Sequence, residues 1–118
     1  GISWLLPRLI GVSNALDLLY SARLISAAEA QAMNLTSRTI AANQLLPETM
    51  AYAESLAREV SPRSLRHMKR EVYDGLFQSL SDATDAANED MLQSFTCDDF
   101  QEGVAHFVEK RPPRFTGK

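Results

Sequence analysis

Residues 46–60, LPETMAYAESLAREV, decide the fold class of this chain. One set of apolar residues in this stretch recurs at intervals of four, three, four and three positions: Leu46, Met50, Ala53, Ala57 and Val60. Residues with this spacing lie on one face of an α-helix. Pro47 falls in the first turn, where the amide hydrogen that proline lacks is not needed. The stretch therefore predicts a helix with one apolar face.

The same spacing continues toward the carboxyl end. Ser61 followed by Pro62 predicts a helix start, with the serine as the cap and the proline as the first helical residue. Two further apolar series follow: Leu65, Met68, Val72, Leu76 and Phe77, and then Leu80, Ala83, Ala87, Met91 and Phe95. Each series predicts one more amphipathic helix.

A last helix is predicted before the carboxyl terminus. Thr96 and Asp99 have the spacing of a capping box, which marks a helix start. The side that this helix is expected to bury carries four large residues: Phe100, Val104, Phe107 and Val108. Pro112 and Pro113 are expected to end it, because proline cannot continue the helical hydrogen-bond pattern.

The amino-terminal stretch opens with apolar residues directly after Gly1. Residues 2–10 lack the basic lead-in and the small-residue cleavage pattern of a signal peptide. Since the first residue is not methionine, we expect the chain to be a piece of a longer protein. Ser13 is the expected cap of a helix over residues 15–20, which are apolar nearly all round and therefore predicted to be well buried.

Signals for short elements follow. Ser26 and Glu29 have capping-box spacing and predict a short helix, for which Asn34 is a suitable stop. Residues 35–40 alternate apolar and polar side chains loosely, and they are the one predicted β-strand.

Composition narrows the function classes. Of the 118 residues, 45% are hydrophobic and 23% are charged, which is ordinary for a globular protein and argues against disorder. The 12 basic and 15 acidic side chains give a net charge of −3, so the overall positive charge of a duplex-binding protein is missing. No apolar stretch approaches the roughly 20 residues of a membrane span. Cys97 is the single cysteine, which excludes an intramolecular disulfide and favours a reducing compartment.

Motifs that define a chemistry by themselves do not occur. The sequence has no glycine-rich phosphate loop, no H-E-x-x-H or paired-cysteine metal motif and no G-x-S-x-G elbow. We therefore predict no metal site. His67 and His106 have polar neighbours and are expected on the surface. Acidic residues that lie between the apolar positions are expected to form solvated faces: Asp82, Asp85, Glu89, Asp90, Asp98, Asp99 and Glu102.

Two basic clusters leave alternatives open. One lies on a predicted helix: Arg63, Arg66, His67, Lys69 and Arg70. It either contacts an anion, such as a ligand phosphate, or forms a solvated face paired with nearby glutamates. The other cluster is the tail, residues 109–118, which two prolines stiffen and in which Phe115 offers an apolar anchor. The tail either docks on a neighbour and meets an anionic ligand, or it is a frayed end.

An ordered set of motifs resembles the crotonase superfamily, the enoyl-CoA hydratases and isomerases. Residues 6–11 read LPRLIG, like the family's L-P-R-L-[IV]-G stretch. Residues 15–30, ALDLLYSARLISAAEA, are similar to the family's A-L-x-L-L-x-x-G-R-x-I-x-A-x-E-A, with Ala22 where glycine is usual. Asn34 also stands at a position where the family has glycine.

The carboxyl-terminal half continues the resemblance. Ser61, Pro62 and Lys69 resemble the family's S-P-x-A-x-x-x-x-K helix. Residues 96–115, TCDDFQEGVAHFVEKRPPRF, are similar to the closing S-x-D-x-x-E-G-x-x-A-F-x-E-K-R-x-P-x-F pattern. The resemblance implies a mainly α fragment, the C-terminal helical trimerisation region of the α/β crotonase spiral fold. Residues 1–44 would be the end of the core region with short helices, and residues 45–118 the helical region and basic tail.

The resemblance also implies a function. The parent protein would act on acyl-CoA thioesters, with hydration of 2-enoyl-CoA as the expected reaction. Its oxyanion hole and catalytic carboxylates would lie upstream, so that this chain holds no catalytic residue and is inactive alone. The same scaffold supports isomerases, hydrolases and decarboxylases. The alternative is a non-catalytic helical assembly module or truncated pseudoenzyme, and a helix-turn-helix nucleic-acid binder is disfavoured by the negative charge.

Partners and binding residues follow from the same resemblance. We expect a homo-oligomer, either a trimer or a dimer of trimers, located in the cytoplasm or in the mitochondrial matrix of a eukaryote, with CoA present only as part of the substrate. Lys110 of the E-K-R motif is expected to reach the CoA phosphates of a neighbouring subunit, unless it is an ordinary surface lysine. Met91 is expected near the acyl or pantetheine part. Trp4 and Leu5 are expected near the acyl pocket or a subunit contact, with core packing as the equal alternative.

Overall fold

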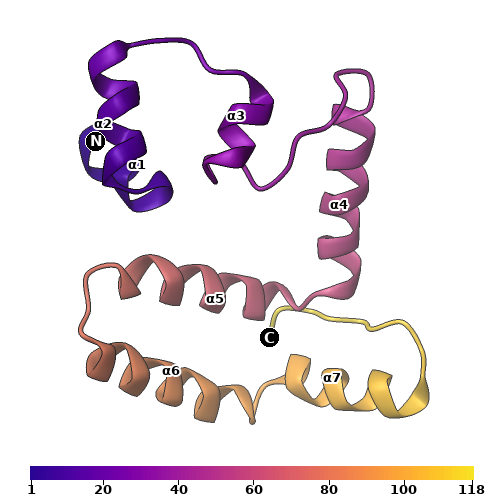
Figure 1. Cartoon of the computed structure of the whole chain (residues 1–118). Helices are drawn as coiled ribbons and strands as arrows, with labels where there is room; N and C mark the ends of the chain where they lie inside the picture. The colour runs from indigo at the N-terminus through magenta and orange to yellow at the C-terminus, as the bar shows by residue number, and fades with distance from the viewer. The chain divides into compact units, whose positions relative to one another are not determined.

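The computed structural model describes all 118 residues, and it consists of helices without a β-strand (Figure 1). Seven helices follow one another: α1 (Ile2–Ile10), α2 (Val12–Ser21), α3 (Ala27–Ala32), α4 (Leu45–Glu59), α5 (Pro62–Gly75), α6 (Leu80–Ser94) and α7 (Asp98–Glu109). The mainly α prediction is therefore confirmed. The chain divides into two compact units, Gly1–Leu45 and Leu46–Lys118.

The first unit is built around the contact between α1 and α2. Its buried residues are Leu6 and Ile10 on α1 and Ala15 on α2, and three partly buried side chains pack against them: Leu18, Met33 and Leu35. Gly11 joins the two helices with φ 79° and ψ 160°. This backbone conformation is open essentially only to glycine, which explains why the turn requires that residue.

Two predictions for α2 are wrong. The helix begins at Val12 after Gly11, so Ser13 lies inside the helix and does not cap it. Only Ala15 is buried, whereas Leu16, Leu19 and Tyr20 are exposed. Within this unit α2 contacts α1 along one face, and the apolar residues on its other faces remain exposed to solvent.

The end of α3 explains why the predicted strand does not form. Ser26 caps α3 as predicted, since its Oγ accepts a hydrogen bond from the Glu29 amide at 3.1 Å. Asn34 ends the helix in the left-handed conformation, with φ 63°. The Leu35 amide then donates to the Ala30 carbonyl at 2.8 Å, closing a Schellman-type turn. Residues 35–40 therefore begin in a helix-terminating turn, and no extended segment lies beside them to form a sheet.

Most predicted helix starts in the second unit are confirmed. Ser61 Oγ accepts from the Ser64 amide at 3.1 Å and caps α5, with Pro62 as its first residue. The predicted box at residues 96–99 is displaced by one position. Cys97 caps α7, because its Sγ accepts from the Phe100 amide at 3.3 Å. Thr96 Oγ1 instead donates back to the Gln93 carbonyl.

The apolar faces of the second unit remain largely uncovered. Helices α5 and α6 contact each other, yet α4, α5 and α6 contain no buried residue. The predicted buried side of α7 is also exposed, from 38% at Phe100 to 78% at Phe107. The amphipathic pattern is thus correct, but the helices of this chain do not bury it.

Candidate functional site

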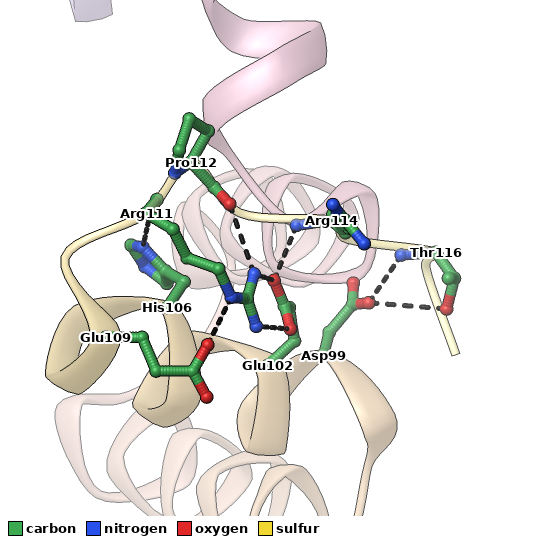
Figure 2. Close-up of polar contacts among 8 residues, drawn as sticks. All are labelled: Asp99, Glu102, His106, Glu109, Arg111, Pro112, Arg114 and Thr116. Atoms are coloured by element: carbon green, nitrogen blue, oxygen red, sulfur yellow. Dashed lines mark hydrogen bonds and ion pairs between the residues drawn. The ribbon is translucent and has the colours of Figure 1, made fainter.

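The tail after α7 folds back along its own helix (Figure 2). The Arg111 guanidinium grips the Glu102 carboxylate with two parallel hydrogen bonds, 2.5 Å from Nη1 to Oε1 and 2.8 Å from Nη2 to Oε2. Its Nε donates to Glu109 at 2.5 Å. The Arg114 amide donates to the same Glu102 carboxylate at 2.6 Å. One glutamate on α7 therefore holds the tail at two points.

A second carboxylate holds the end of the tail. Asp99, at the start of α7, is only 5% exposed. Its carboxylate accepts from the Ser61 hydroxyl at 2.5 Å and from the amides of Thr116 and Gly117 at 2.7 and 3.0 Å. The Asp99 amide in turn donates to the Lys118 carbonyl at 3.0 Å. The tail is consequently ordered from residue 111 to residue 118, and the frayed-end alternative is wrong.

An aromatic contact completes the docking of the tail. Phe115 meets the ring of His106 edge to face, with ring centroids 5.9 Å apart. Gly103 lies beneath Phe115, where a Cβ would come to 4.0 Å from the phenyl ring, an ordinary contact distance. The predicted apolar anchor is therefore present, but it packs against this chain's own α7.

Three acidic residues predicted on solvated faces are instead structural anchors, and each has a lowered pKa. Hydrogen bonding to Arg111 lowers the pKa of Glu102 to about 2. The hydrogen bond from Arg70, followed by that from His67, lowers the pKa of Asp90 to about 2. Burial raises the pKa of Asp99, but hydrogen bonds from Ser61 and the tail outweigh it and leave this pKa below its ordinary value. All three are ionised at neutral pH and are unsuited to proton transfer there.

The basic cluster on α5 is largely occupied by polar partners on α6. Asp90 accepts from Arg70 and lies 3.1 Å from His67 Nδ1. Arg63 Nη1 donates to Ser94 Oγ at 2.6 Å. The paired alternative thus holds for His67 and Arg70, with an aspartate in place of the expected glutamates, while Arg63 binds a hydroxyl.

The prediction of two surface histidines is wrong. The side chain of His67 is only 17% exposed beside Asp90. His106 is half-buried, with its Nδ1 3.3 Å from the Arg111 carbonyl oxygen. Both histidines lie against groups from elsewhere in the chain, which spacing alone does not reveal.

Lys110 is the cation at the end of α7 that stays free. It caps the helix in the left-handed conformation, with φ 54°, and its amide donates to the His106 carbonyl. Its side chain is exposed and forms neither a hydrogen bond nor an ion pair. It borders an open hollow of about 510 Å³ together with His106, Phe107, Val108 and Arg111. The structure thus leaves Lys110 available for an external anion and excludes Arg111, which is held by Glu102 and Glu109.

The other predicted binding residues lie elsewhere. Met91 is half-exposed and lines a groove of about 300 Å³ between α5 and α6, and this groove does not reach Lys110. Trp4 and Leu5 belong to α1 in the first unit, and both are partly exposed. The Arg8 guanidinium covers the Trp4 ring at 3.8 Å from its centroid. Their roles in binding stay predictions.

The second unit also has an open apolar groove. It has a volume of about 540 Å³ and lies between the α4–α5 junction, α7 and the tail. Its apolar wall is lined by Val60, Phe100, Val104 and Phe107, and its polar lining includes Ser61 and Asp99.

None of the seven helices combines the length and the apolar character needed to cross a membrane.

Comparison with known proteins places the chain in a family. The profile of the enoyl-CoA hydratase/isomerase family matches residues 1–118. The chain is 40% identical to a probable enoyl-CoA hydratase of Mycobacterium leprae, over 98% of this chain and 45% of that protein. It is 34% identical to the mitochondrial methylglutaconyl-CoA hydratase of Homo sapiens, over 96% of this chain and 34% of that protein. The chain belongs to the enoyl-CoA hydratase/isomerase family.

Solved structures of enoyl-CoA hydratases have the same fold as this chain. A probable enoyl-CoA hydratase/isomerase from Mycobacterium abscessus superimposes with a TM-score of 0.94 at 30% identity, over 99% of this chain and 46% of that one. An enoyl-CoA hydratase from Bacillus anthracis gives the same TM-score and identity, over 100% of this chain and 45% of that one. The expected fold, the helical C-terminal region of the crotonase spiral, is confirmed. The chain spans less than half the length of these relatives.

Proposed function

We propose that these 118 residues are the C-terminal part of an enoyl-CoA hydratase, a lyase that adds water across the double bond of a 2-enoyl-CoA thioester. The observation that carries this proposal is the family match over every residue, together with hydratase relatives at 34–40% identity. Bacterial and mitochondrial proteins are both among these relatives, which supports a cytoplasmic or matrix location.

The carboxylates of this chain support the proposal that the acid–base groups of the enzyme lie in another part of the protein. Activation of water needs a carboxylate that changes its protonation near the operating pH. The three partly buried carboxylates described above are instead bound by cations, a hydroxyl or backbone amides, with lowered pKa values. The general acid–base groups and the oxyanion hole then lie outside these residues, and the chain alone is inactive.

The binding role proposed for this chain rests on Lys110. Its ammonium has no internal partner, so it is available for a phosphate of CoA on a neighbouring subunit. Met91 would contact the acyl or pantetheine part, and Trp4 and Leu5 the acyl pocket or a subunit contact. The uncovered apolar faces of α4 to α7 support association into a trimer or a dimer of trimers, because apolar patches of this extent usually form interfaces.

The same uncovered faces favour the second candidate, a non-catalytic assembly module. Hydration of a short 2-enoyl-CoA, followed by loss of the conjugated thioester absorbance, separates the two candidates. The complete gene product that contains these residues should hydrate the substrate, whereas the 118-residue chain alone should not. A complete gene product that assembles and binds CoA without turnover would leave the assembly module as the function.

A further inference from the structure

The turn that carries Lys110 is held in a strained conformation by its neighbours. A left-handed backbone costs free energy at any residue other than glycine, so contacts around Lys110 must maintain it. The amides of Lys110 and Arg111 both donate to the His106 carbonyl, and the side chains of Glu109 and Arg111 are joined at 2.5 Å across the lysine.

Glu102, eight residues before Lys110 on α7, also holds this turn in place. Its two oxygens bind the Arg111 guanidinium as a fork, and Oε1 also accepts from the Arg114 amide at 2.6 Å (Figure 2). A bidentate fork of this kind fixes direction as well as distance. The side chains of Glu102 and Arg111 are 19% and 30% exposed, so water competes only in part for these bonds.

The same contacts distinguish the two neighbouring cations Lys110 and Arg111. The Nε of Arg111 donates to Glu109 and both terminal nitrogens donate to Glu102, whereas the Lys110 ammonium has no partner. A cation neutralised by two carboxylates is a poor ligand for a phosphate. Arg111 is thus suited to hold the turn, and Lys110 to meet the ligand.

We propose that Glu102 is a positioning residue for CoA recognition, which acts through its fork with Arg111 to present Lys110 to the CoA phosphates. This inference rests on the proposed function, because Lys110 has a phosphate to meet only if the protein binds CoA. Glu102 itself touches no substrate. Its loss should therefore weaken recognition of the phosphate-bearing part of CoA and leave the reacting thioester unaffected.

The test compares two substrates that differ in their phosphates. In the complete gene product, Glu102→Gln should raise the KM for 2-enoyl-CoA about five-fold, the factor lost with an ion-pair contact of moderate strength. The variant should leave kcat unchanged, together with the KM for the matching 2-enoyl-pantetheine, which has no phosphate. Arg111→Lys should act in the same direction, because lysine keeps the charge and loses the fork. Glu54→Gln, which removes a carboxylate from an exposed pair on α4, is the control without effect.

A double variant tests whether Glu102 acts through the lysine. In a Lys110→Ala background, Glu102→Gln should raise the KM for 2-enoyl-CoA no further. An equal rise for both thioesters, or an additive effect in the Lys110→Ala background, would overturn the inference and leave Glu102 a purely structural anchor.

A failure of the proposed function can be told apart from a failure of this inference. The hydratase proposal is contradicted if the unsubstituted protein hydrates neither thioester. Calorimetric titration with CoA and with pantetheine then makes the same comparison without turnover. Weaker binding of CoA alone by Glu102→Gln would support the inference, and unsubstituted protein that binds CoA no tighter than pantetheine would refute it.

Discussion

The Ser61 hydroxyl donates to the Asp99 carboxylate at 2.5 Å, joining two residues that lie 38 positions apart in the chain. Ser61 caps α5 and Asp99 stands in the first turn of α7, so this bond connects the starts of two helices. Both side chains are buried, at 6% and 5% exposure. Because Asp99 also accepts from the amides of Thr116 and Gly117, one carboxylate ties α5, α7 and the tail together.

Replacing Ser61 by alanine should destabilise the second unit by about 1–3 kcal/mol, since the change removes a helix cap and leaves a buried carboxylate short of a donor. Urea titration followed by circular dichroism measures this loss. Ser79→Ala is the matched control, because Ser79 caps α6 with the same 3.1 Å bond, and its hydroxyl donates to the exposed carboxylate of Asp82. The control should lose about 1 kcal/mol or less. Equal losses in both variants would show that the Ser61–Asp99 bond adds nothing to the cap.

Lowering the pH below about 4.5 should release the tail from α7, whereas neutral pH should leave it bound. The pKa of Glu102 lies at about 2 in the folded chain, below its ordinary value of 4.5. A lowered folded pKa stabilises the fold above pH 4.5, and this stabilisation is lost as the pH falls from 4.5 toward 2. Asp90 adds a loss in the same direction between α5 and α6, with its pKa lowered from 3.8 to about 2.

Urea midpoints measured from pH 7 to pH 2.5 check this expectation. The midpoint should stay nearly constant down to about pH 5 and then fall. Glu102→Gln should start lower at pH 7 and fall less steeply below pH 4.5, because glutamine does not titrate. A midpoint with the same pH profile in both proteins would contradict the assignment of the lowered pKa to the Arg111 fork.

Much of the helical layout follows from local sequence. Caps such as Ser26 and Ser61 satisfy amides only three residues away, so their effect is visible in the sequence. The errors arise where two local signals compete. Gly11 precedes α2 where Ser13 is the predicted cap, and Cys97 holds the capping position predicted for Thr96. The predicted strand after α3 failed because its first residues are used to close the helix.

The network around the tail was beyond local patterns. Glu102 and Arg111 are nine residues apart, and Ser61 and Asp99 are 38 apart, so neither pair has a helical or capping spacing. One sequence signal was available for them. The basic tail follows a helix that carries Asp99 and Glu102 in its first half, and opposite charges on adjoining segments favour docking. The position of these acidic residues between apolar ones predicts a solvated face instead.

Ala22→Gly should stabilise the first unit by about 1 kcal/mol. Ala22 ends α2 with φ 48°, a left-handed conformation that disfavours residues with a Cβ and suits glycine. Ala32→Gly provides the opposite control, because Ala32 is the exposed last residue of α3, where the backbone is still helical and glycine is expected to cost up to about 1 kcal/mol. Thermal unfolding of the two variants should therefore shift in opposite directions. A loss of stability in Ala22→Gly would refute the left-handed assignment.

Lys110→Ala should raise the KM for 2-enoyl-CoA several-fold in the complete gene product and leave kcat nearly unchanged. An exposed ammonium that meets a phosphate gives a contact that salt screens, so the KM of the variant should also depend less on ionic strength. The initial rate at several salt concentrations measures both effects. Arg58→Ala removes an exposed cation from α4 and should change neither quantity. An unaltered KM for Lys110→Ala at low salt would make Lys110 an ordinary surface residue.

Trp4→Ala should change the preference for acyl-chain length if Trp4 borders the acyl pocket. The ring is 38% exposed, with the Arg8 guanidinium 3.8 Å from its centroid, so part of this large apolar surface is open to a ligand or a second subunit. Removing it enlarges any pocket that it lines, and longer acyl chains should then gain in kcat/KM relative to short ones. Leu9→Ala, which removes a more exposed apolar side chain from the same helix, is the control. Reduced stability with an unchanged chain-length profile would assign Trp4 to packing, and a shifted oligomeric state by light scattering would assign it to a subunit contact.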